Sequence, residues 1–298
     1  MRSCISLLAL TVLICSCDEK KEPVSPSKSY RISHIECEKN NYRQTFEYNE
    51  NGLVTSLVVS QDESWGKSRI EATYEYSDDN SVIKISAEER TVEITRRVFS
   101  ETLYLNANGT AKRAEGSFIK FIKYDSDYEI IRKNYTVEFQ YDSFDQLTDI
   151  SISEKRTDVT GWEEDKSLDW KVALVWDEGN IKEYSEYYTS PKRTLMTKRT
   201  YSYYGGLSIE YMPINHGPIL RYFYLPLQYQ GMLGKRSESP VKRETIYFIR
   251  SGNETGGYNL DYSYDLSNSI HDTRVEAFSK VSSLTGEELN YKVCWESE

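Results

Sequence analysis

The sequence has little of what most enzymes depend on. It holds three histidines, and His34, His216 and His271 stand far apart along the chain. It contains no Gly-x-Ser-x-Gly nucleophile motif, no glycine-rich phosphate loop, no His-Glu-x-x-His and no Cys-x-x-Cys. Acidic pairs such as Glu88-Glu89 and Glu287-Glu288 are typical of solvated loops. We therefore expect no enzymatic activity and no cofactor.

The stretch His34-Ile35-Glu36-Cys37 comes nearest to a set of metal ligands. Alternate residues of a strand face opposite sides of the sheet, so His34 and Glu36 share one face and Cys37 lies on the other. These residues therefore make a poor trio, and we expect no metal site here.

Basic charge is also in short supply. The chain has 37 Lys and Arg against 47 Asp and Glu, which gives a formal net charge of -10. Nucleic-acid binding needs stripes of Lys and Arg to neutralise phosphates. We therefore expect no nucleic-acid partner.

The N-terminus carries an apolar run that is too short to be a membrane helix. Residues 5–14 are apolar and follow Arg2, whereas a helix needs about 20 residues to span a bilayer. A short basic start before such a run is typical of a signal peptide.

The residues that follow, Ile14-Cys15-Ser16-Cys17, resemble the lipobox of bacterial lipoproteins. The resemblance implies that residues 1–16 are removed and that Cys17 becomes a diacylated, palmitate-bearing N-terminus. Residues 17–29 then form a polar, proline-containing tether. The alternative is an ordinary secretory signal with incidental cysteines. We expect a lipid anchor at the outer membrane, facing either the periplasm or the cell surface.

Two cysteines remain in the folded chain, Cys37 and Cys294. A disulfide is permitted outside the cytoplasm, and this one would need the first and last strands to meet. Two unpaired thiols are the alternative, and the sequence leaves both open.

Residues 30–298 alternate apolar and polar side chains in segment after segment, as in 69–77 and 244–251. This period of two indicates strands, and apolar spacing typical of helices is scarce. We predict one all-β domain over 30–298.

A similar turn recurs between these strands. In its clearest copy, Phe46-x-Tyr48 precedes Asn49-x-x-Gly52. Asn or Asp at the first turn position bonds its own backbone, and Gly or Asn at the fourth tolerates a positive φ. Related copies begin at Tyr74, Leu103, Phe139, Val175, Tyr201 and Tyr262. We predict serial antiparallel hairpins in one large, strongly curved or barrel-like sheet. A calcium loop is the rival interpretation, but no turn supplies the run of oxygen ligands that calcium needs.

The turn motif is similar to that of YD/RHS-type repeats, and closer still to a family of Bacteroidetes-type lipoproteins of unknown function with a porin-like fold. The stretch 225–248, with Gly231, Gly234-Lys235, Ser237 or Ser239, and Pro240, also resembles a late segment of that family. The resemblance implies a curved or barrel-like antiparallel sheet and brings no activity with it.

The strands themselves argue against a pore. A lipid-facing strand needs an uninterrupted apolar face, whereas charge interrupts each face within 92–105 and 119–134. The chain also ends without a terminal aromatic residue. We therefore expect a sheet that is not membrane-spanning.

Tyrosine is abundant, with 25 residues, and many of them crowd the middle of the chain. Rings on a concave face could stack on sugars or apolar ligands, with hydroxyl groups for orientation. The alternative is that these rings form the core. The candidate ligand face is Tyr184, Tyr187, Tyr201, Tyr203, Tyr211, Tyr222 and Tyr224. We expect a binding module for a glycan or an apolar ligand, or alternatively a scaffold that binds an envelope protein.

Overall fold

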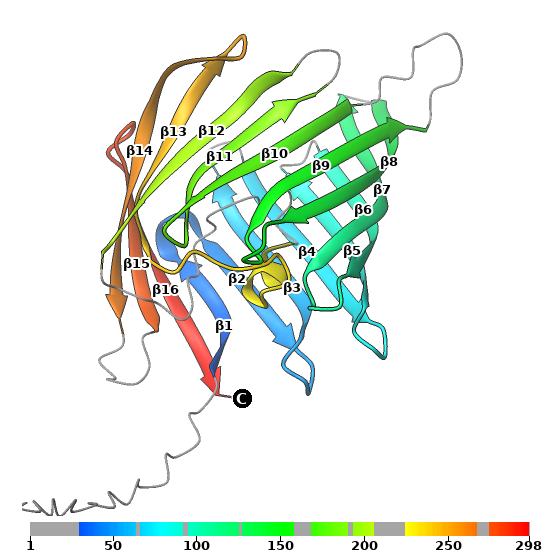
Figure 1. The fold of residues 1–298 in the computed structure, drawn as a ribbon, viewed down its shortest axis with the longest axis horizontal. Coiled ribbons are helices and arrows are strands. Elements are labelled where there is room, and N and C mark those ends of the chain that lie inside the picture. Colours follow the sequence, from blue (N-terminus) through cyan, green and yellow to red (C-terminus); the bar gives the residue numbers. More distant parts are fainter. Residues whose placement is uncertain are drawn as a thin grey trace, which may run out of the picture.

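The structure is a single closed barrel of antiparallel strands. The computed structural model describes residues 30–63, 66–91, 95–124, 127–157, 168–189, 193–205, 224–266 and 274–297. Sixteen strands follow one another around the barrel, each paired with its neighbours in sequence, and β1 closes on β16 (Figure 1). The strands are β1 (Tyr30–Cys37), β2 (Tyr42–Tyr48), β3 (Val54–Glu63), β4 (Gly66–Tyr76), β5 (Val82–Thr91), β6 (Thr95–Leu105), β7 (Ala111–Tyr124), β8 (Asp127–Tyr141), β9 (Leu147–Arg156), β10 (Leu168–Asp177), β11 (Asn180–Tyr188), β12 (Thr194–Tyr203), β13 (Val241–Arg250), β14 (Asn253–Leu266), β15 (Val275–Ser282) and β16 (Glu288–Ser297).

The recurring turns close hairpins, as the sequence predicted. Gly52, Asn80, Gly109 and Asp145 have φ values of 75, 54, 82 and 59°. Each residue occupies the fourth position of its turn, where a left-handed backbone favours Gly, Asn or Asp. The Asn49 side-chain oxygen accepts two backbone N–H groups of its own turn, each at 3.0 Å. The predicted serial hairpins are therefore confirmed.

The two faces of the sheet differ in polarity. The cross-strand row Ile83, Leu103, Ala114 and Val137 is at most 1% exposed. Full burial of an Ile, Leu or Val side chain stabilises the fold by about 1.5–3 kcal/mol. Alternate positions face outward and carry polar groups, such as Arg243 on β13, which pairs with Asp261 on β14 at 2.6 Å. The interior is therefore the apolar side of the strands.

One segment leaves the hairpin pattern and enters the barrel. The prediction of a tight turn after Tyr203 was wrong, because β13 begins only at Val241. Tyr204 and Pro240 still bond at the base of these two strands, so the chain makes an excursion between neighbours. Its described part, 224–240, which we term the plug, contains the short helix α1 (Leu225–Tyr229). No helix in the described ranges is long and apolar enough to cross a membrane.

The plug lies inside the barrel at the end with the short turns, low in Figure 1. Its backbone bonds Ala111 at the start of β7 and Asp145 in the turn between β8 and β9. The Gln230 side chain donates a hydrogen bond of 3.2 Å to the carbonyl of Gly52, in the turn between β2 and β3. Because the plug touches turns from several hairpins, it fixes their relative positions.

The seam between β1 and β16 closes the ring. Tyr30 lies opposite Ser297 and Glu36 opposite Lys292. The register shifts between Ile32 and His34, so Ser33 is an extra residue that bulges from β1.

Candidate functional site

The interior at the plug end is filled and tied together by a buried carboxylate. Glu101 on β6 is 3% exposed. Tyr135 of β8 donates its hydroxyl to Glu101 Oε2 at 2.8 Å, and Tyr224 of the plug donates to Oε1 at 2.7 Å. A buried carboxylate is costly unless such donors satisfy it. Glu101 therefore links the plug to the barrel wall.

A glycine makes room for this arrangement. Gly116 on β7 lies between Glu101 and Tyr135 in the cross-strand register. A Cβ at Gly116 would come within 2.5 Å of the Tyr135 hydroxyl. The missing side chain therefore lets the Tyr135 ring cross the strand and reach the carboxylate.

A second buried carboxylate lies on the opposite part of the wall. Glu244 on β13 is 3% exposed, and it accepts hydrogen bonds from Arg199 and Tyr262, both at 2.9 Å. Burial first, and then the nearby Glu244 carboxylate, raise the pKa values of Tyr201 and Tyr262. Both hydroxyl groups therefore stay protonated and available as donors.

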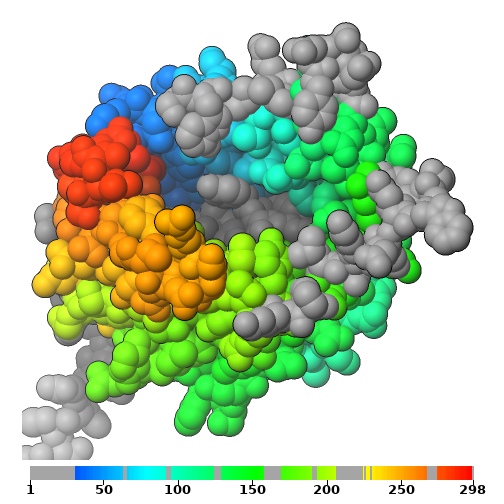
Figure 2. All heavy atoms as spheres, turned by 90° about the horizontal axis from the view of Figure 1, so that it is seen from above, coloured from blue at the N-terminus to red at the C-terminus, as the bar shows by residue number. Residues whose placement is uncertain are grey.

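Away from the plug the inward-facing side chains are packed less tightly. Trp170, Glu186 and Tyr258 are half-buried, Tyr188 is 37% exposed, and the Arg199 side chain is 40% exposed. Each lies on the same strand face as a buried core residue. We term these five residues the upper lumen. Figure 2, which views the barrel from the end opposite the plug, shows the ring of strands around a hollow.

Charges of both signs also face the interior. Lys133 pairs with Glu154 at 2.9 Å and Arg97 with Glu89 at 3.0 Å. Burial raises the pKa of Glu186, which favours its neutral form more than at the surface. The two ion pairs each combine one positive and one negative side chain, so they add polarity to the interior without net charge.

The predicted tyrosine face is only partly formed. Tyr184 and Tyr201 point inward and are each 8% exposed, and Tyr224 is fully buried, so all three serve as core. The Tyr203 hydroxyl donates to the Ile181 carbonyl at 2.6 Å. Tyr187 alternates with Tyr184 and faces outward, with Arg193 over its ring at 4.2 Å. Tyr211 and Tyr222 lie outside the described residues.

Sequence reasoning missed Trp170 and Tyr188 as lumen residues. The only sequence signal for them is spacing: Trp170 is two residues from Val172, and Tyr188 is four residues from Tyr184, so each lies on the same strand face as that buried residue. Without knowing which face turned inward, the sequence could not rank them.

The two cysteines do not form a disulfide. The first and last strands meet, as a bond would require, but Cys37 points into the barrel and Cys294 lies opposite His34 on the outer face. Both are free thiols. The alternation of the strands therefore places the two sulfur atoms on opposite sides of the sheet.

Comparison with known proteins reveals the fold. No protein-family model matches the sequence, and no curated protein is significantly similar to it. A porin-like protein from Bacteroides uniformis, solved by crystallography, is similar in structure, with a TM-score of 0.51 and 16% sequence identity over 90% of this chain and 98% of that one. Another, from Bacteroides vulgatus, has a TM-score of 0.54 and 12% identity over 89% of this chain and 98% of that one. The barrel has a porin-like fold.

This similarity corrects one expectation. The sequence was predicted to form a sheet that is not membrane-spanning, because charge interrupts the strand faces. That prediction was wrong: the sheet closes into a full barrel and its structural neighbours are porin-like. Charged side chains lie on both faces of the barrel wall: Lys133 and Glu154 pair in the interior, and Arg243 and Asp261 pair on the outer face.

Proposed function

We propose that this protein is an outer-membrane lipoprotein whose upper lumen binds a glycan. The porin-like neighbours support association with the outer membrane. The lipobox-like residues at 14–17 support anchoring through Cys17, which lies outside the described residues. Labelling cells with a palmitate analogue tests the anchor: Cys17→Ala should abolish labelling, and labelling that persists would contradict it.

The observation that carries the binding proposal is the contrast between the two ends of the barrel interior. At the plug end, Tyr224 and Leu227 are fully buried. In the upper lumen, Trp170 and Tyr188 are cross-strand neighbours that keep exposed surface, and Glu186 is the next inward-facing residue on β11. Binding sites typically combine apolar or aromatic walls with a few polar groups. A sugar ring offers an apolar face and hydroxyl groups, which match this combination.

Calorimetry with a panel of neutral and acidic oligosaccharides tests the proposal. Replacing Tyr188 with Ala should weaken binding about tenfold, which corresponds to losing about 1.4 kcal/mol of contact energy. The matched control is Tyr104→Ala, since Tyr104 is 39% exposed and Tyr188 37%, but Tyr104 faces outward from β6. Equal effects of the two variants, or no binding across the panel, would overturn the proposal.

A protein partner is the second candidate. Closure of the barrel leaves no free edge strand among the described strands, so a partner would contact turns. Phe144, in the turn between β8 and β9, is 72% exposed, and exposed aromatic side chains are enriched in interfaces. Pull-down from solubilised membranes should then recover a stoichiometric partner that Phe144→Ser loses, whereas recovery unchanged by this variant would exclude the turn as the contact.

A further inference from the structure

Barrel closure assembles a group of metal-ligand side chains that no local stretch contains. His34 and Glu36 lie on the outer face of β1, and Cys294 of β16 is the cross-strand neighbour of His34. One potential ligand atom from each lies within 4.8 Å of the other two, and all three residues are half-buried. His34 Nε2 lies 3.9 Å from Glu36 Oε2. Cys37 drops out of the set, because it points into the barrel, and Cys294 takes its place.

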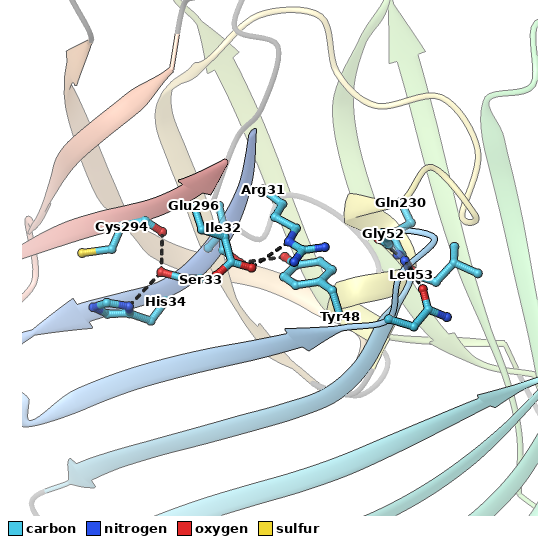
Figure 3. A network of polar contacts seen from close by, with 11 residues as sticks. Arg31, Ile32, Ser33, His34, Tyr48, Gly52, Leu53, Gln230, Cys294 and Glu296 are labelled. Atoms are coloured by element: carbon cyan, nitrogen blue, oxygen red, sulfur yellow. Dashed lines mark hydrogen bonds and ion pairs between the residues drawn. The ribbon is translucent and has the colours of Figure 1, made fainter. Parts of the chain in front are cut away.

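The bulged residue Ser33 orients the imidazole. Its hydroxyl lies 3.1 Å from the Cys294 carbonyl, to which it donates, and 3.0 Å from His34 Nδ1 (Figure 3). A serine hydroxyl has a single proton. When that proton lies on the carbonyl, Ser33 accepts from Nδ1–H, and the neutral ring then carries its hydrogen on Nδ1. A hydrogen bond at one ring nitrogen is how metal-binding histidines are usually fixed.

This tautomer leaves a lone pair on Nε2, which lies 3.9 Å from a Glu36 carboxylate oxygen that also has only lone pairs. Two acceptors at this distance make no direct hydrogen bond to each other, and a cation between them would satisfy both. The thiol of Cys294 adds a third donor of the type that zinc prefers.

We propose that His34, Glu36 and Cys294 bind one zinc-class divalent cation, which clamps the first strand of the barrel to the last. Zinc bonds of about 2.0–2.3 Å to nitrogen, oxygen and sulfur in a tetrahedron place ligand atoms roughly 3.3–3.7 Å apart. The observed separations therefore need only side-chain rotation to close. Three protein ligands and one water molecule complete the coordination.

Two basic side chains and the protons of the ligands compete with the metal. Arg43 and Lys292 lie opposite Glu36 on the two neighbouring strands, and both are exposed, so they compete for its carboxylate. Binding also requires a neutral His34 and the Cys294 thiolate, with the thiol proton released to solvent.

Cobalt(II) titration of the full chain, without an affinity tag, tests the site. We expect one equivalent to bind with a thiolate-to-cobalt charge-transfer band, and zinc to displace it. Cys294→Ser should abolish the band, and His34→Ala and Glu36→Gln should each weaken affinity at least tenfold. Cys17→Ser is the matched control and should leave the band unchanged. Zinc should raise the unfolding temperature of the wild type and leave that of Cys294→Ser unchanged, because metal binding favours the folded state.

A second measurement does not depend on whether variants fold. Zinc should protect Cys294 of the wild type from alkylation, as mapped by mass spectrometry. A charge-transfer band that survives Cys294→Ser, a band lost in Cys17→Ser, or alkylation of Cys294 at the same rate with and without zinc would overturn the proposal. If no metal binds and His34 and Glu36 form only an ion pair with each other, the proposal is overturned as well.

Discussion

Removing the hydroxyl group of Tyr224 should loosen the plug without disturbing its packing. In Tyr224→Phe the ring stays, and the ring is fully buried, so no cavity forms. What disappears is the bond of 2.7 Å to Glu101 Oε1. A hydrogen bond to a charged group contributes about 1.5–3 kcal/mol, and we expect the free energy of unfolding to fall by this amount.

Urea unfolding followed by both fluorescence and circular dichroism measures the change. If the two signals change together, a two-state treatment applies. The urea concentration at the midpoint of unfolding should then fall, while the dependence of the unfolding free energy on urea stays unchanged. Tyr104→Phe is the control, since Tyr104 is 39% exposed on the outer face and should change stability by less than about 0.5 kcal/mol.

A double-mutant cycle with Glu101→Gln isolates the contact. Because the two side chains touch, the coupling energy should lie at about 0.5–3 kcal/mol. If Tyr224→Phe costs no more than Tyr104→Phe, or the two changes simply add, the carboxylate does not hold the plug and the reasoning fails.

Three further predictions concern single positions. Gly116→Ala would place a Cβ 2.5 Å from the Tyr135 hydroxyl, and we expect a loss of about 1–3 kcal/mol in urea unfolding; unchanged stability would show that the wall can shift. Hydrogen bonds, first from Ser77, lower the pKa of Asp79 to about 2. The stabilisation that they give is present above the ordinary value of 3.8 and is lost as the pH falls through about 2. NMR titration of Ser77→Ala should move the midpoint upward, and an unmoved midpoint contradicts the assignment. Glu178 has φ 48° in an exposed turn, so Glu178→Asn should stabilise by about 0.5–1 kcal/mol in the same unfolding assay, and a loss of stability would refute the turn argument.

The hairpins could be predicted from the sequence because the information that specifies them is local. Asn49 and Gly52 satisfy one turn through their own hydrogen bonds and φ angle, and strand alternation extends from there. Neither depends on a residue far along the chain.

The features that were missed depend on contacts between distant residues. Tyr203-Tyr204-Gly205 has the composition of a turn, yet β13 begins only at Val241, and the plug that precedes it buries Tyr224 and Leu227 against the barrel interior. Which residues line the lumen likewise depends on which face of each strand turns toward the interior of the barrel. The third proposed metal ligand, Cys294, comes from the opposite end of the sequence to His34, so no motif could connect them.

The β1–β16 seam has a consequence for the order in which the chain folds. Every other pairing joins strands adjacent in sequence, so hairpins can form locally and add to one another. The seam pairs Tyr30 with Ser297 and closes the longest loop in the molecule, which makes it a slow, late step. Until that step, β1 and the growing end of the sheet are unpaired edges that invite intermolecular association. A chain that lacks β16 would keep those edges permanently, so we expect it to aggregate rather than to fold as a smaller barrel.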